Sequence, residues 1–136
     1  MSYGVSAALQ QAVYQRLQAD STLDTLVGTA IYDAVPAGII TGTFVSIGPE
    51  DVVEKSDMTG HGALHEFTVS VVTDAAGFQQ AKEVAAAVSD SLVDATLILA
   101  RGNLVYLNFN RAKARRVQDA DVRRIDLTFH ARVQDT

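Results

Sequence analysis

The sequence predicts an α+β fold, in which a mostly antiparallel β-sheet carries two helices packed on one face. Residues 65–71 alternate apolar and polar side chains, which is the period of a strand with one buried face. Residues 78–92 then place apolar side chains three or four positions apart, which is the period of a helix with one apolar stripe. Two more alternating segments, at 104–115 and 122–133, end the chain as a hairpin.

The first third of the chain supplies the second helix. Apolar residues at helical spacing predict this helix over 6–19. The sequence Ser21-Thr22-Leu23-Asp24 is a capping-box pattern and predicts a short second turn. An extended piece is expected at 31–33, and a strand at 43–47 that Gly48-Pro49 closes.

The middle of the chain is less regular. In the segment from Glu50 to Leu64, the residues Val52 to Lys55 could extend as a strand, whereas Ser56 to Gly62 are polar and glycine-rich, which predicts a long mobile loop. Asp74 is the expected N-cap of the central helix. The apolar faces of all these elements should form one core. Its expected members are Phe67, Val69, Val71, Phe78, Ala85, Val88, Leu92, Leu107, Phe109, Leu127 and Phe129.

Composition limits the classes of function. The chain has 136 residues, of which 48% are hydrophobic, and this is enough for a single domain with a core. No apolar run approaches the roughly 18 residues that a membrane span needs, and the first residues do not have the pattern of a secretion signal. The chain has no cysteine, which excludes disulfides and thiolate zinc sites and fits synthesis in a reducing cytoplasm.

The net charge of −5 is unevenly distributed along the chain. Residues 1–100 carry three basic and 12 acidic side chains, a net −9, whereas residues 101–136 carry eight basic and four acidic ones, a net +4. Many of the basic side chains lie near the turn of the final hairpin. This part of the chain is either a surface for an acidic partner or nucleic acid, or a solvated hairpin that is rich in arginine.

No residue pattern indicates catalysis, a cofactor or a metal. The chain lacks the phosphate-binding glycine loop, the dinucleotide fingerprint and the nucleophile elbow. His61 and His65 are four residues apart, but a glycine-rich loop that enters a strand does not place them as a zinc-binding pair. A small hydrolase that uses His65 or His130 has only the presence of these side chains in its favour. We therefore expect no catalytic residue, no cofactor and no bound metal.

Nucleic-acid binding is the alternative function. Arg111, Lys113 and Arg115 share one face of their predicted strand, and a basic sheet with interleaved aromatic side chains such as Tyr106 and Phe109 could bind a single strand. Against this, Phe109 lies on the predicted buried face and the whole chain is acidic. The alternative is thus a small nucleic-acid-binding module that uses the basic C-terminal hairpin.

The order of the elements carries a resemblance. The segments that carry it are Ala8 to Leu17, Leu23-Asp24-Thr25-Leu26-Val27-Gly28, Ile31-Tyr32-Asp33-Ala34-Val35-Pro36, Phe44 to Gly48, His65 to Val71, Leu104 to Leu107 and Phe129 to Val133. In this order the segments resemble the small tail-completion, or tail-terminator, proteins of long-tailed bacteriophages and gene transfer agents. One departure is the segment from Val72 to Gly77, where the family often has an aromatic residue and more polar side chains.

The resemblance implies a single tail-terminator-like domain over residues 1–136 and a structural role without catalytic residues. Such a subunit, usually one of six in a ring, ends the tail tube and joins it to the head. The implied partners are further copies of the chain, the tail-tube protein and a head–tail connector or stopper protein, but no membrane. DNA would pass through the ring without sequence-specific binding. The implied location is the neck end of the tail of a virion or phage-like particle, after synthesis in a bacterial cytoplasm.

A head-to-tail ring joins two different surfaces of each subunit. In this chain the basic hairpin could meet the acidic loop side of the next subunit, or an acidic surface of the tail tube. The hypothetical interface residues are Arg111, Lys113, Arg115, Arg116, Arg123 and Arg124 on the basic side, and Glu50, Asp51, Glu54 and Asp57 on the acidic side. The resemblance applies equally to phages and to gene transfer agents, and either face of the ring could meet the head.

Overall fold

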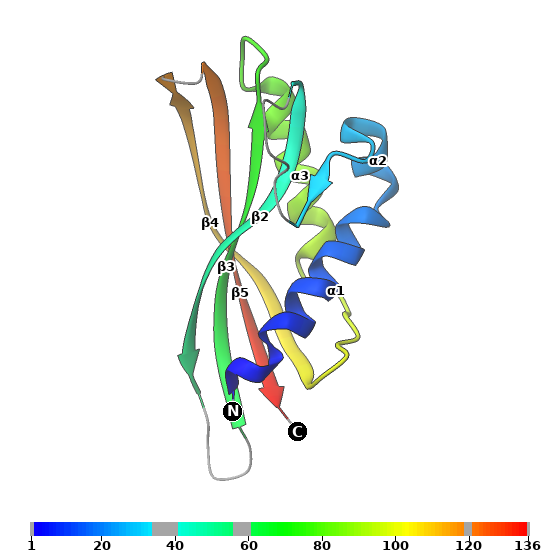
Figure 1. Cartoon of the computed structure of the whole chain (residues 1–136), viewed down its shortest axis with the longest axis vertical. Coiled ribbons are helices and arrows are strands. Elements are labelled where there is room, and N and C mark those ends of the chain that lie inside the picture. Colours follow the sequence, from blue (N-terminus) through cyan, green and yellow to red (C-terminus); the bar gives the residue numbers. More distant parts are fainter. Residues whose placement is uncertain (1, 34–40, 56–60, 119–120, 136) are drawn as a thin grey trace.

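A twisted five-stranded sheet forms the frame of the protein (Figure 1). The computed structural model describes residues 2–33, 41–55, 61–118 and 121–135. The strands are β1 (Ile31–Tyr32), β2 (Thr43–Glu54), β3 (His61–Thr73), β4 (Asn103–Val117) and β5 (Val122–Asp135), and their order in the sheet is β1-β2-β3-β5-β4. β1 pairs with β2 in parallel, and the other neighbours are antiparallel. The mostly antiparallel α+β architecture is therefore confirmed.

The helices cover one face of this sheet and leave the other face open (Figure 1). A 3-10 turn, η1 (Ser2–Val5), leads into α1 (Ser6–Gln18) and α2 (Ser21–Val27), and α3 (Gln79–Leu92) follows β3. In the described part of the chain, no helix is long and apolar enough to cross a membrane. The two long helices lie where the apolar periodicity predicts them.

Two predicted helix caps are wrong. α2 begins after Asp20, whose Oδ1 accepts a hydrogen bond from the backbone N–H of Leu23 at 3.0 Å, so Ser21 lies inside the helix. Asp20 is the N-cap because its carboxylate lies three residues before Leu23, whose backbone N–H has no partner within the helix. Asp74 does not cap α3, which begins at Gln79. Asp74 Oδ2 instead accepts from the backbone N–H of Gly42 at 2.9 Å and ties the start of β2 to the end of β3.

The predicted end of the second strand at Gly48-Pro49 is wrong, and so is the predicted loop over Ser56 to Gly62 where it includes His61 and Gly62, which belong to β3; the possible strand from Val52 is confirmed as far as Glu54. β2 continues through Gly48-Pro49 to Glu54, and β3 already begins at His61. The pairing with β3 shifts between Ile47 and Glu50. This bulge accommodates a proline that has no N–H to donate to the ladder, so the strand passes the proline instead of ending there. Residues 56–60 lie outside the described residues.

The core lies between the helices and the sheet. Of the predicted core residues, Phe67, Val69, Val71, Ala85, Val88, Leu92, Leu107, Leu127 and Phe129 are buried, and Phe78 packs against them from the side. Phe109 is the exception, with 44% of its surface exposed. It faces the helix side and contacts Phe129 edge to face at 6.0 Å between ring centres, but β4 is the last strand of the sheet, and no described strand pairs with its outer side.

The substitution Phe129→Ala should lower the free energy of unfolding by about 3–5 kcal/mol, because it empties a fully buried aromatic site. The matched variant Phe109→Ala should cost clearly less, because its ring is already partly in solvent. Urea denaturation of both variants beside the parent protein measures the difference. Equal losses would mean that β4 is covered in solution and that the assignment of its edge is wrong.

Candidate interaction surface

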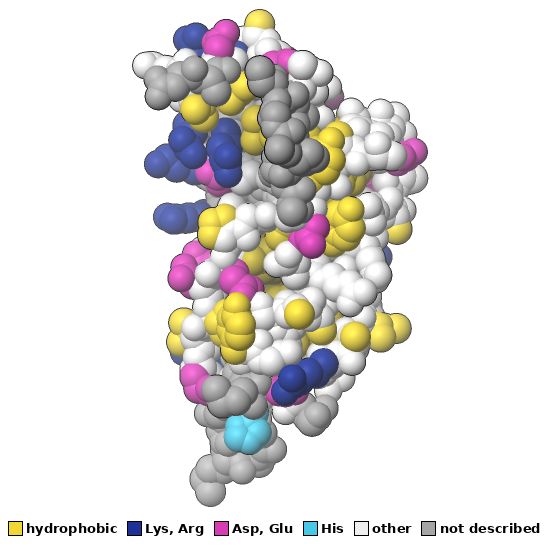
Figure 2. All heavy atoms as spheres, in the orientation of Figure 1, with side chains coloured by type: hydrophobic (Ala, Val, Ile, Leu, Met, Phe, Trp, Pro, Cys, Tyr) yellow, Lys and Arg dark blue, Asp and Glu magenta, His cyan; other side chains and the backbone are white. Residues whose placement is uncertain are grey.

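The open face of the sheet carries a basic groove near the turn between β4 and β5. Arg111, Lys113 and Arg115 of β4 share one face, as predicted. It is the open face because the bulge between Phe109 and Arg111 reverses the alternation that would have placed them on the helix side. Arg124 joins them because it pairs with Arg115 across the two strands. The groove has a volume of about 320 Å³, and Pro49, Thr68, Asp126 and Thr128 complete its lining. Figure 2 shows Lys and Arg gathered on this side of the molecule.

One carboxylate lies among these cations. Asp126 Oδ1 accepts from Arg124 Nε at 2.8 Å and from Ser70 Oγ at 2.7 Å, and Arg115 Nη2 lies 3.8 Å from Asp126 Oδ2. Partial burial alone would raise the pKa of Asp126, but the hydrogen bonds from Ser70 and Arg124 and the two arginine charges together lower it below its usual value. Within the described residues Arg111 and Lys113 have no ion-pair partner, so the groove keeps an excess of positive charge.

Two of the predicted interface arginines are not in the basic groove. Arg116 and Arg123 pair with each other across β4 and β5 one position further on, and therefore point to the helix side. Arg116 Nη2 bonds Asp121 Oδ1 at 3.0 Å. Arg123 Nη1 donates to the carbonyl of Ala75 at 2.9 Å, and its guanidinium lies 5.6 Å from the ring centre of Phe78. The basic residues of the hairpin are thus divided between the two faces of the sheet.

The predicted acidic partners lie in a strand and not in a loop. Glu50, Asp51 and Glu54 belong to β2, and Asp57 lies outside the described residues. Glu50 points to the helix side, where Oε1 accepts from Ser6 Oγ at 2.6 Å and Oε2 lies 3.7 Å from His65 Nδ1. β2 ends at the opposite end of the sheet from the β4–β5 turn (Figure 1). Pro49, the neighbour of Glu50 in β2, lines the basic groove, but within the described residues no ion pair joins Glu50 or Asp51 to the cations of the groove.

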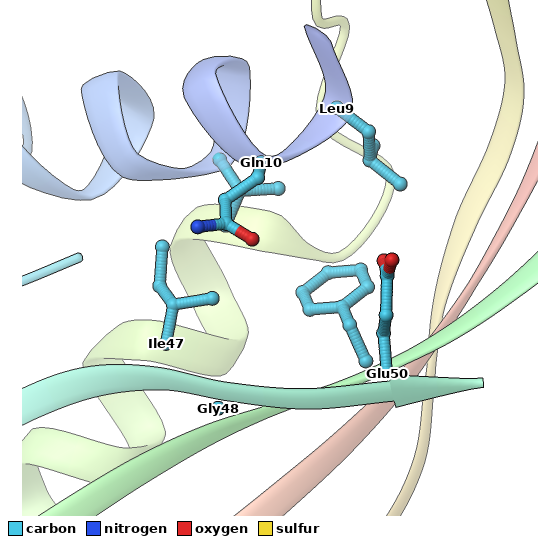
Figure 3. A pocket seen from close by; sticks show the side chains of 7 residues that line it. Leu9, Gln10, Ile47, Gly48 and Glu50 are labelled. Carbon is cyan, nitrogen blue, oxygen red and sulfur yellow. The ribbon is translucent and has the colours of Figure 1, made fainter. Parts of the chain in front are cut away.

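A small cavity lies beside Glu50, between α1 and the sheet (Figure 3). Leu9 and Gln10 of α1 close it from above, and Ile47, Gly48 and Phe67 form much of its remaining wall. Its volume of about 10 Å³ corresponds to roughly one water molecule, so it has no room for a substrate.

The histidines are spread over separate environments. His61 is exposed, whereas His65 is fully buried and neither of its ring nitrogens has a hydrogen-bond partner within the described residues. On the open face His130 Nε2 lies 3.3 Å from Glu66 Oε2. The described residues contain no group of three or more His, Cys, Asp or Glu side chains that could hold a metal.

The structure also has an apolar groove that the sequence analysis missed. It runs between α3 and the edge strand β4, has a volume of about 310 Å³, and is lined by Lys82, Ala85, Ala86, Ser89, Phe109, Ala112, Ala114, Ile125 and Leu127. The available signal was the alternation of small Ala112 and Ala114 with charged residues in β4. Small side chains on one face of a strand leave room above them, which is what opens the groove beside α3.

The lowered pKa of Asp126 gives a test of the basic groove. A depressed pKa in the folded state contributes stability above the unfolded-state value of about 3.9, and this contribution is lost as the pH falls through the folded-state pKa. The parent protein should therefore be more stable than Asp126→Asn at neutral pH, and the difference should shrink below about pH 4. Ser70→Ala, which removes one donor, should show a smaller effect of the same sign. Unfolding free energies measured across this range would contradict the assignment if the difference were independent of pH.

Comparison with known proteins agrees with the resemblance seen in the sequence. Residues 11–134 match the family model of the tail completion protein gp17. No curated protein matches the chain. A chain in the solved structure of the virion of a native gene transfer agent particle is 65% identical and superposes with a TM-score of 0.92, over 98% of this chain and 99% of that chain. Because the family match spans most of the sequence, the chain belongs to the family of the tail completion protein gp17.

Proposed function

We propose that this protein is a structural subunit of the tail of a gene transfer agent or related phage-like particle. In this role residues 1–136 act as a single domain, and six copies form a ring that ends the tail tube and joins it to the head. The observation that carries the proposal is the match over nearly the full length of both chains to a component of a gene transfer agent virion. The role is one of assembly and not of catalysis.

The proposed partners follow from this position at the neck end of the tail. They are further copies of the chain, the tail-tube protein below the ring and a connector or stopper protein above it. DNA passes through the ring without sequence-specific binding. Synthesis in the bacterial cytoplasm precedes assembly.

Charge supports the choice of contact surfaces. The basic groove with its neighbours Arg116 and Arg123 is proposed to meet Glu50, Asp51, Glu54 and Asp57 of another subunit, or an acidic surface of the tail tube. Glu54 ends β2 at the end of the sheet opposite the β4–β5 turn, so a contact between it and the basic groove joins different molecules. Each exposed pair contributes only about 0–1 kcal/mol, but a ring repeats the contact at every interface.

One observation favours the alternative, a nucleic-acid-binding module. Tyr106 is 41% exposed and lies on the open face with Arg111 and Lys113, so an aromatic ring and free cations share one surface. A monomer whose affinity for single-stranded DNA falls steeply with salt would support this alternative.

Removal of the protein tests the proposed function. Cells that produce the particle without this protein should release heads that lack tails and tail tubes of uneven length, because nothing ends the tube. Electron microscopy of the particles measures both effects, and supply of the protein from a plasmid should restore joined particles. Native mass measurement of the isolated tail-end complex should give six copies. Normal particles without the protein would contradict the proposal.

The double variant Arg111→Glu/Lys113→Glu should leave the monomer folded, because neither side chain has an ion-pair partner within the described residues. It should weaken assembly, most strongly at low salt where charges are least screened. The neutral pair Arg111→Gln/Lys113→Gln should have an intermediate effect, and Gln11→Glu on the exposed side of α1, outside both proposed surfaces, serves as a surface control. Counts of joined particles at two salt concentrations measure the result. If both pairs assembled like the parent at low salt, the basic groove would be only a solvated surface.

A further inference from the structure

The apolar groove between α3 and β4 is open on a strand that ends the sheet. We propose that it receives the α2 side of a neighbouring copy of this chain, so that α2 of one subunit docks between α3 and β4 of the next. The inference rests on the proposed ring and names the surfaces by which its subunits meet side by side.

The groove exposes several neighbouring apolar side chains to solvent. Phe109 is 44% exposed, and Ala112, Ala114 and Ala86 are exposed beside it. Exposed apolar side chains that are contiguous and rimmed by polar residues mark interaction sites. Here Lys82 lies at the α3 rim, and Arg111 and Lys113 stand on the other face of the same strand.

The edge strand itself argues against a simple extension of the sheet. β4 has bulges between Leu104 and Tyr106 and between Phe109 and Arg111, and it carries three basic side chains in its last third. Bulges and charged side chains on an edge strand oppose pairing with another strand. A partner therefore places its side chains in the groove, over Ala112 and Ala114, and does not pair with β4 as an additional strand.

The opposite side of the same subunit has the complementary charge. Residues 2–33 contain one basic side chain, Arg16, and its Nε donates to the carbonyl of Ser91 at 3.0 Å. The acidic side chains of this region are Asp20, Asp24 and Asp33, and Asp24 is exposed on α2. Leu26 and Val27 on the same short helix are only partly buried. The α2 side therefore offers apolar contact with a negative rim.

The position of the two surfaces suits a closed ring. In Figure 1, α2 lies on the right and the last part of β4 lies on the left, both in the upper half of the molecule. A neighbour that is related by rotation about an axis parallel to the long axis of the molecule places its α2 beside this groove at the same height. Such a contact joins two different surfaces of the subunit, and it forms a closed ring when the rotation between neighbours divides a full turn into a whole number of steps.

Cysteine cross-linking tests the contact, since the chain has no cysteine of its own. The double variant Ala112→Cys with Thr22→Cys, or with Thr25→Cys, should give a ladder of disulfide-linked oligomers when assembled particles are oxidised. Each single variant should give no ladder. The matched control Ala112→Cys with His61→Cys, which pairs the groove with the far end of the sheet, should also give none. The contact is wrong if the particles contain the double-cysteine proteins and neither double variant forms a ladder.

Charge exchange provides a second readout. Asp24→Lys and Lys82→Glu should each lower the yield of joined particles by about tenfold, because like charges at an interface are strongly unfavourable. The two together should restore most of the yield, whereas Asp24→Asn should have a smaller effect. If the two substitutions together did not restore the yield, the proposed docking of α2 would be wrong, but the proposal that the subunits form a ring would still stand. If the parent protein is absent from the tail end, the proposed function fails, and this inference fails with it.

Discussion

The pairing of β3 with β5 is the constraint on which the rest of the structure depends. The two strands stay in register without interruption, from His61 opposite Asp135 to Thr73 opposite Arg123. Side chains alternate across a strand, so this register decides which residues meet the helices and which meet solvent. It stacks Phe67 on Phe129 at 5.6 Å between ring centres on one face, and places Ser70 opposite Asp126 on the other. The core and the basic groove are two results of one register.

The regular parts of this fold could be predicted because their side chains repeat. One face of each of these elements packs on the core and the other faces away from it, as in β3, β5, α1 and α3. Their apolar side chains therefore repeat every two residues in the strands and about every 3.6 residues in the helices. A bulge cannot be predicted from this periodicity, because it is defined by an extra residue in one strand relative to the strand with which it pairs. The sequence analysis therefore closes the second strand at Gly48-Pro49, and it counts Phe109 as buried although no described strand pairs with the outer side of its strand.

The same limit applies to the candidate interaction surface. Alternation correctly places Arg111, Lys113 and Arg115 on one face, because no bulge interrupts β4 after Arg111. It also places Arg124 and Asp126 on one face of β5, two residues apart, but it does not reveal that Arg124 donates to Ser70, since that contact depends on the register of β5 against β3. The helix cap shows a related limit, because Asp20 and Ser21 are both good capping residues and only the backbone decides between them.

The charged edge strand has a consequence for the subunit before it is built into anything. An uncovered strand can add to the edge of any other sheet, which is a common route to aggregation. On β4 the lysine and arginine side chains and the two bulges oppose this, and the net charge of −5 adds a general repulsion between whole molecules. These features oppose aggregation of free copies, although each copy exposes an apolar groove. The fifteen residues of β4 thus carry the charges and bulges that oppose extension of the sheet, and they also form one wall of the apolar groove.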